Sequence, residues 1–251
     1  MNTLFIGQKI IHLSEIDSTN NYAARQVKEN KALEGLVVWA DYQTEGKGQR
    51  SKIWESEKGK NLLCSIVLMP NFIDVSHQFI LNKAIAVAVL KTAEMICPGS
   101  FIKIKWPNDI LMDNKKLAGI LLEATIIGSQ IGSLIVGVGM NVNQRSLQVE
   151  GREAVSIAQE LGNEIPIEAV LQTFCKFLEV EYLKLKAGKY SQIDADYQQN
   201  LWKLNEIQLF ETEGQAVQLK IKSVDENGLL VTENEQGETI KFKNGELVYL
   251  D

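Results

Sequence analysis

The chain has 251 residues, 45% of them hydrophobic and 23% charged, which suits one large folded domain with a possible small appendage. No apolar run reaches the roughly 18 residues of a membrane span, and the N-terminus has no secretory signal, so we expect a cytoplasmic protein with no membrane partner. The net charge of −6 argues against broad nucleic-acid binding, so we expect no DNA partner and only a local anion site.

The first part of the chain predicts an α+β core. A helix is expected from about 20 to 28, because the hydroxyl of Ser18 or Thr19 can cap its free backbone N–H groups. The runs 35–43 and 61–70 are short, apolar and rich in β-branched residues, which is typical of buried strands.

The middle of the chain predicts one buried helix and three further strands. Residues 77–96 are apolar around most of the helical circumference and are followed by a Cys-Pro-Gly stop. Residues 101–106 alternate like a strand, and 107–109 predict a turn after it. The runs 117–127 and 133–143 predict an antiparallel hairpin.

The last hundred residues change character near Leu204. Residues from about 152 to 200 predict helices, whereas the segment after Leu204 holds short strands separated by Gly-containing turns, which is typical of a small barrel. We therefore expect two domains, 1–203 and 204–251. The three cysteines lie in apolar sequence and predict buried thiols, and two isolated histidines without a CxxC motif argue against a tetrahedral zinc site.

A stretch at 45–54, EGKGQRSKIW, combines two glycines with three cations. Gly46 and Gly48 let backbone N–H groups approach an anion, and Lys47, Arg50 and Lys52 compensate its charge. The stretch matches neither the Walker pattern nor the dinucleotide fingerprint. Taken alone, a single short stretch of this kind is more often a solvated hairpin tip than a phosphate site.

Two further stretches carry polar groups at strand ends. Within 105–124, Asn108 and Asp109 follow a strand, and Lys116 enters the next strand beside Leu117, so its ammonium is expected to be partly shielded. The alternative for the lysines at 115 and 116 is an exposed turn. Within GVGMNVN at 137–143, two glycines precede Asn141, a pattern also explained by a close strand crossing.

Together these stretches resemble the biotin protein ligase family. The resemblance rests on five motifs in family order: DSTN (17–20), DYQTEGKGQRSKIW (41–54), KWPNDIL (105–111), KKLAGILLE (115–123) and GVGMNVN (137–143). It implies a class II synthetase-like mixed sheet with helices, followed by a small SH3-like β-barrel. It also implies biotin–[acetyl-CoA-carboxylase] ligase activity, in which biotin and Mg-ATP give biotinyl-5′-AMP and a lysine of a biotin carboxyl carrier protein then takes the biotin. Because the resemblance opens near residue 1, the chain is similar to members without an N-terminal DNA-binding domain.

The resemblance also implies site residues. The positions that it assigns to biotin are Ser18, Thr19, Asn20, Gln43, Lys47, Gly48, Gln49 and Lys116. Those that it assigns to ATP and the adenylate are Gly46, Gly48, Arg50, Trp54, Asn108 and Asn141, with Trp54 supporting the adenine. Lys116, Lys47 and Asp109 are implied as catalytic, and Asp109 as the Mg²⁺ ligand. The chain departs from the family at Gln49, where an arginine is usual, and we expect Arg50 to supply the missing charge.

Other interpretations remain open at this point. A lipoate or octanoate protein ligase has the same core fold, and a non-catalytic biotin sensor could use the same pocket. The charges of Asp109 and Lys116 argue against a pure binding module. The pattern allows a monomer or a homodimer, with strands around 131–143 as a possible pairing edge.

Overall fold

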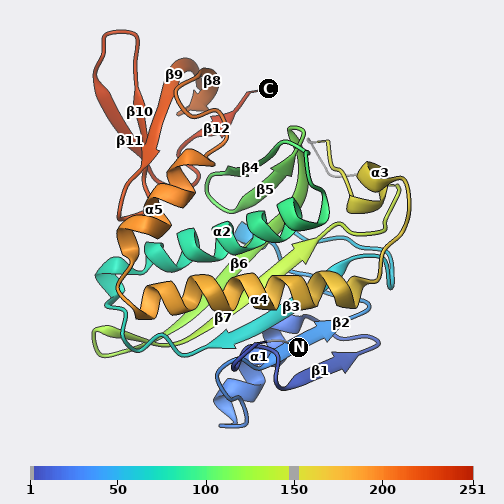
Figure 1. Cartoon of the computed structure of the whole chain (residues 1–251). Helices are drawn as coiled ribbons and strands as arrows, with labels where there is room; N and C mark the ends of the chain where they lie inside the picture. Colours follow the sequence, from blue (N-terminus) through green and yellow to red (C-terminus); the bar gives the residue numbers. More distant parts are fainter. Residues whose placement is uncertain (1–2, 147–152, 251) are drawn as a thin grey trace.

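The computed structural model describes residues 3–146 and 153–250. It is a mixed α+β fold with a seven-stranded sheet, helices on both faces of that sheet and a separate antiparallel sheet at the C-terminal end (Figure 1). The fold class expected from the sequence is confirmed. No helix in this described part of the chain is long and apolar enough to cross a membrane.

The large sheet is antiparallel except at one edge, where β1 and β2 run parallel. Its strands in spatial order are β1 (Ile10–Leu13), β2 (Val37–Ala40), β3 (Leu62–Leu68), β7 (Gln130–Met140), β6 (Lys115–Ile127), β5 (Asp109–Met112) and β4 (Ile102–Lys105). The buried strands and the hairpin are confirmed. The pairing edge expected around 131–143 is wrong, because β7 lies between β3 and β6. The turn expected at 107–109 is also shorter, because Asp109 already begins β5.

Helices cover the two faces of this sheet differently. The helices α2 (Phe79–Ile96), α4 (Ile167–Lys186) and α5 (Tyr190–Gln199) belong to the main core, whereas α1 (Thr19–Lys28) packs on the opposite face (Figure 1). The short helix α3 (Ile157–Leu161) comes after β7, the last strand of this sheet in chain order. The helices expected at 20–28, at 77–96 and within 152–200 are confirmed, although residue 152 itself lies outside the described residues.

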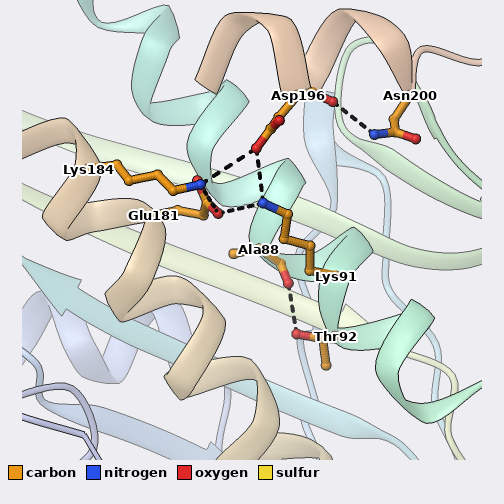
Figure 2. A network of polar contacts seen from close by, with 7 residues as sticks. All are labelled: Ala88, Lys91, Thr92, Glu181, Lys184, Asp196 and Asn200. Carbon is orange, nitrogen blue, oxygen red and sulfur yellow. Dashed lines mark hydrogen bonds and ion pairs between the residues drawn. The ribbon is translucent and has the colours of Figure 1, made fainter. Parts of the chain in front are cut away.

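A network of charged side chains joins α2, α4 and α5 (Figure 2). Glu181, whose side chain is fully buried, accepts from Lys91 at 2.9 Å and from Lys184 at 3.0 Å. Asp196 pairs with the same two lysines at 3.0 and 3.6 Å. Because each charge faces opposite charges on neighbouring helices, the network fixes how these helices pack.

The C-terminal sheet has five antiparallel strands. In spatial order they are β11 (Thr239–Phe242), β10 (Leu230–Glu233), β9 (Gln215–Val224), β8 (Ile207–Thr212) and β12 (Val248–Tyr249). Lys83 of α2 is buried beneath this sheet, where it donates to the carbonyl of Val224 at 2.8 Å and to Asp194 at 2.5 Å. The sheet is therefore anchored to the helical layer by buried polar contacts.

The three cysteines are unpaired and buried, as the sequence predicts. Burial raises the pKa of Cys97 to about 11 and that of Cys175 to about 12. Both thiols therefore stay protonated near neutral pH and act as small apolar side chains.

Candidate functional site

A cavity of about 1180 Å³ opens on the α1 side of the large sheet. Its walls come from the start of α1, the glycine-cation loop (46–54), the turn before β5, and the end of the C-terminal sheet. All the site residues predicted from the sequence line this cavity except Gly46. Five motifs that are distant in sequence thus meet in one place.

Two glycines of β7, Gly137 and Gly139, line the floor of the cavity. They point to the same face as the buried Ser65 of β3, because alternate residues of a strand share a face and β3 pairs with β7 at Ser65 and Gly137. A Cβ at Gly137 would collide with the amide of Asn20, and one at Gly139 would lie 2.5–2.8 Å from the indole of Trp54. The glycines of the GVGMNVN motif therefore make room for two site side chains, rather than for a crossing strand.

A row of polar side chains runs along one wall. Gln43 Oε1 accepts from the backbone N–H of Thr19 at 2.7 Å and from its hydroxyl at 3.0 Å. Ser65 Oγ lies 2.8 Å from Thr19 Oγ1 and donates to Asn20 Oδ1 at 2.6 Å. Asn20 Nδ2 in turn donates to Glu123 at 2.7 Å. These groups are held in fixed orientations by one another, as recognition of a polar ligand requires.

The cap of α1 differs from the expectation. Ser18 occupies the N-cap position, but its side chain makes no capping hydrogen bond. The first N–H of the helix is satisfied instead by the Gln43 side chain, which comes from outside the helix. The hydroxyl of Thr19 is thus directed to Gln43 and Ser65 in the wall of the cavity.

An ion pair marks the opposite wall. Lys116 Nζ lies 2.8 Å from Asp109 Oδ1, and the two side chains are only 20% and 9% exposed. The expected shielding of Lys116 is confirmed. Its Nζ also lies 5.5 Å from the centre of the Trp54 ring. The pair therefore places one positive and one negative charge beside an aromatic surface, in partial isolation from water.

Two asparagines support this wall through the backbone. Asn108 Nδ2 donates to the carbonyl of Ile120 at 2.7 Å. Asn141 Nδ2 lies 3.2 Å from the carbonyl oxygens of both Lys116 and Val155. Their amide groups therefore hold the strands that carry Asp109 and Lys116.

The glycine-cation loop forms a narrow hairpin. The N–H of Trp54 donates to the carbonyl of Gly46 at 2.9 Å, and the N–H of Gly48 donates to that of Lys52 at 2.7 Å. A Cβ at Gly46 would collide with the carbonyl of Trp54, so this glycine closes the loop although it does not line the cavity. Lys47 Nζ donates to Asn21 of α1 at 2.5 Å. The loop thus lies over the cavity, not out in solvent as a free hairpin tip would.

Sequence reasoning missed Ser65 and Glu123. Ser65 is fully buried in the middle of β3, and its only signal was one hydroxyl inside an otherwise apolar run. Glu123 ends the KKLAGILLE motif, and only its contact with Asn20 gives it a place in the site.

Among residues 3–146 and 153–250, no three or more His, Cys, Asp or Glu side chains gather as they would to hold a metal ion by themselves. Asp109 supplies a carboxylate on the cavity wall. Mg²⁺ is commonly bound by one or two carboxylates together with substrate phosphates, so this single carboxylate fits an ion that arrives with a nucleotide.

Comparison with known proteins gives consistent matches. The family model of the biotin/lipoate A/B protein ligases matches residues 13–141. The bifunctional ligase/repressor BirA of Bacillus spizizenii is 31% identical over 240 residues, which cover 94% of this chain and 73% of that protein. A biotin–[acetyl-CoA-carboxylase] ligase of Mycobacterium tuberculosis is 26% identical over 95% of this chain and 88% of its own length.

A solved structure is similar over nearly the whole chain. The biotin protein ligase of Aquifex aeolicus in complex with biotin and ATP superposes with a TM-score of 0.78 at 27% identity, covering 97% of this chain and 99% of that one. The similarity therefore extends from the large sheet to the C-terminal sheet.

Proposed function

The chain belongs to the biotin/lipoate A/B protein ligase family, and from this premise we propose that it is an ATP-dependent biotin protein ligase. In the first step, the biotin carboxylate attacks the α-phosphate of ATP, giving biotinyl-5′-AMP and pyrophosphate. In the second, a lysine amine of a carrier protein attacks the biotinyl carbonyl, and AMP leaves.

This proposal rests mainly on one observation: two walls of different chemistry line the same cavity. On one side lies a row of matched hydrogen-bonding groups, and on the other the shielded pair of Lys116 and Asp109. Attack of a carboxylate on a phosphate brings two anions together, and negative charge grows on the bridging oxygen as pyrophosphate leaves. A cation held at low exposure favours this transition state more than water does.

Each wall suits one substrate. Ser18, Thr19, Asn20 and Gln43 offer hydroxyl and amide groups for the ureido ring of biotin. Lys116 would bridge the biotin carboxylate and the α-phosphate. The remaining residues proposed to contact the loop side of biotin are Lys47, Gly48 and Gln49.

The nucleotide would lie beside the lysine wall. Trp54 offers an aromatic surface next to Lys116, and Asn108 and Asn141 hold the adjoining strands. Gly48 and Arg50 come from the loop above. Mg²⁺, bound by Asp109 and the phosphates of ATP, would neutralise charge on the departing pyrophosphate.

The second step requires an acceptor lysine to reach the adenylate. We propose that the acceptor is the biotin carboxyl carrier domain of a biotin-dependent carboxylase, because the names of the relatives in Mycobacterium tuberculosis and Paracoccus denitrificans give acetyl-CoA carboxylase as the protein that is modified. We also propose that residues 1–203 form the catalytic unit and 204–251 a smaller unit that completes the cavity, since Asn244, Gly245, Leu247, Val248 and Tyr249 contribute to its lining.

The proposal is tested by pyrophosphate exchange into ATP in the presence of biotin, lipoate or neither. We expect exchange with biotin alone, followed by transfer to a carrier domain. Exchange with lipoate would identify a lipoate ligase instead. Binding of biotin without any exchange would identify a sensor.

A further inference from the structure

The C-terminal sheet contacts two walls of the cavity. On the lysine side, Trp106 Nε1 donates to the carbonyl of Gly228 at 3.0 Å, in a buried contact three residues before Asp109. On the loop side, the turn between β11 and β12 (243–245) meets the tip of the glycine-cation loop. The small sheet thus bridges two segments that must stay in register across the site.

The contact on the loop side uses two adjacent loop residues. Asn244 Nδ2 donates to Gln49 Oε1 at 3.0 Å. The guanidinium of Arg50 donates to the backbone carbonyl of Asn244. Gly245, at φ +90°, has no Cβ, and a Cβ there would overlap the guanidinium of Arg50. Arg50 therefore occupies space that only a glycine at 245 leaves open.

Both partners are held in defined backbone conformations. Arg50 adopts the left-handed region at φ 53° and ψ 47°, which is unfavourable for a residue with a side chain and persists only where the surroundings stabilise it. Two internal hydrogen bonds close the opposing turn. The N–H of Lys243 donates to Glu246 Oε2 at 2.7 Å, and the N–H of Glu246 donates to the carbonyl of Lys243 at 3.1 Å. A rigid turn thus meets a strained loop.

We propose that the 243–245 turn is a latch that positions the glycine-cation loop over the reaction intermediate. That the loop retains biotinyl-5′-AMP rests on the proposed function. The contact between the 243–245 turn and the loop does not depend on it. Asn244 and Gly245 act as positioning residues through Gln49 and Arg50. In this arrangement Arg50 helps to retain the adenylate by docking the loop on the C-terminal sheet, in addition to lining the cavity beside the nucleotide.

The experiment compares Gly245→Ala with Gly237→Ala. Both glycines have left-handed backbone angles and both lie in turns of the C-terminal sheet, at φ +90° and +80°. A Cβ at Gly237 meets nothing within 4 Å, whereas one at Gly245 displaces Arg50. The pair therefore separates backbone strain, which both variants share, from loss of the latch.

Two readouts are measured in the full-length protein. The first needs no substrate: trypsin cleavage after Lys47, Arg50 and Lys52 should become roughly tenfold faster in Gly245→Ala than in Gly237→Ala, in line with the loss of one or two hydrogen bonds. The second is release of biotinyl-5′-AMP, followed as labelling of bystander lysines on an unrelated protein, which should rise by a similar factor.

A double-mutant cycle of Gln49→Ala and Asn244→Ala provides an independent test if Gly245→Ala folds poorly. The two changes should be non-additive in trypsin susceptibility, because they remove the same hydrogen bond. Equal cleavage rates and equal leakage for the two glycine variants, or strict additivity in the cycle, would overturn the latch. If the wild type showed no biotin-dependent exchange of pyrophosphate into ATP, the proposed function would be overturned. The trypsin cleavage rates would still decide whether the 243–245 turn holds the glycine-cation loop.

Discussion

The two faces of the central strands of the large sheet are built from opposite kinds of residue. Toward α2 and α4, β3 and β7 present Ile66, Val136 and Val138, all buried in the main core. On the other face, the same strands present Ser65 and Gly137. Of two neighbouring residues in one strand, one therefore packs in the main core and the next faces the site.

The difference shows how one sheet provides stability and binding at once. Large aliphatic side chains on the helix face bury apolar surface, which is the main stabilising term in folding. On the site face, glycines leave that surface bare so that Asn20 and Trp54 can lie against the backbone. Changes on the helix face should therefore alter stability, and changes on the site face should alter reaction chemistry.

The largest expected effect on stability lies on the helix side, at Glu181. Glu181→Ala removes the buried carboxylate that Lys91 and Lys184 share, while both lysines keep Asp196 as a partner, so it should destabilise the protein by about 2–3 kcal/mol. Glu168→Ala, on an exposed position of the same helix, is the control and should change the unfolding free energy little. Urea unfolding measures both. A stability loss below about 1 kcal/mol for Glu181→Ala would show that the network is not needed for packing.

On the site side, Lys116→Ala should lower kcat for adenylate formation by about 100- to 1000-fold with a smaller effect on KM, because the ammonium acts mainly in the transition state. Lys115→Ala is the matched control, since that neighbouring side chain is about half exposed and pairs with Glu153. Pyrophosphate exchange measures both variants. Exchange by Lys116→Ala within a few-fold of wild type would remove the lysine from the mechanism.

Gly137→Ala and Val136→Ala compare the two faces on adjacent residues. The new methyl at 137 pushes against the Asn20 amide, so biotin binding should weaken by about 1–3 kcal/mol. Val136→Ala removes buried core volume away from the cavity lining and should lower the melting temperature while biotin affinity is largely kept. Calorimetric titration and thermal unfolding measure the two effects. The contrast fails if both variants lose affinity equally.

Thr19→Val keeps the shape of the side chain but removes its hydroxyl contacts with Gln43 and Ser65. Biotin binding should weaken roughly tenfold with ATP affinity nearly unchanged, because the polar row loses one matched group. Unchanged biotin affinity together with a lower melting temperature would mean that the hydroxyl serves only the start of α1.

The smallest effect is expected at Asp17, which directly precedes the cavity-lining Ser18 in the chain. Hydrogen bonds from Arg25 hold the pKa of this carboxyl well below its usual range, although partial burial opposes the shift. A lowered folded-state pKa stabilises the protein fully above the unfolded pKa of about 3.9, and this contribution is lost as pH falls below it. Asp17→Asn should therefore lower stability by less than about 1 kcal/mol at pH 7, and the difference should shrink below pH 4. A difference that stays constant with pH would contradict this assignment.

The sequence predicted the elements and the site segments better than their contacts. The 3.6-residue and two-residue periodicities identify α2 and β3 because burial itself creates those patterns. Strand β5 was missed because it follows a turn directly. The role of Gly137 could not be predicted, because it depends on where α1 places Asn20. The contact of Arg50 with Asn244 joins residues 194 positions apart, which no local pattern encodes.

Hydrogen–deuterium exchange, measured with and without biotin plus ATP, tests the central claim that reaction chemistry is confined to the site face. The account predicts that slowed exchange is concentrated in the glycine-cation loop (46–54), in the start of α1 and in 137–143, while peptides of α2 and α4 stay unchanged. Unchanged exchange in the loop, or equal slowing in the helices behind the sheet, would contradict it.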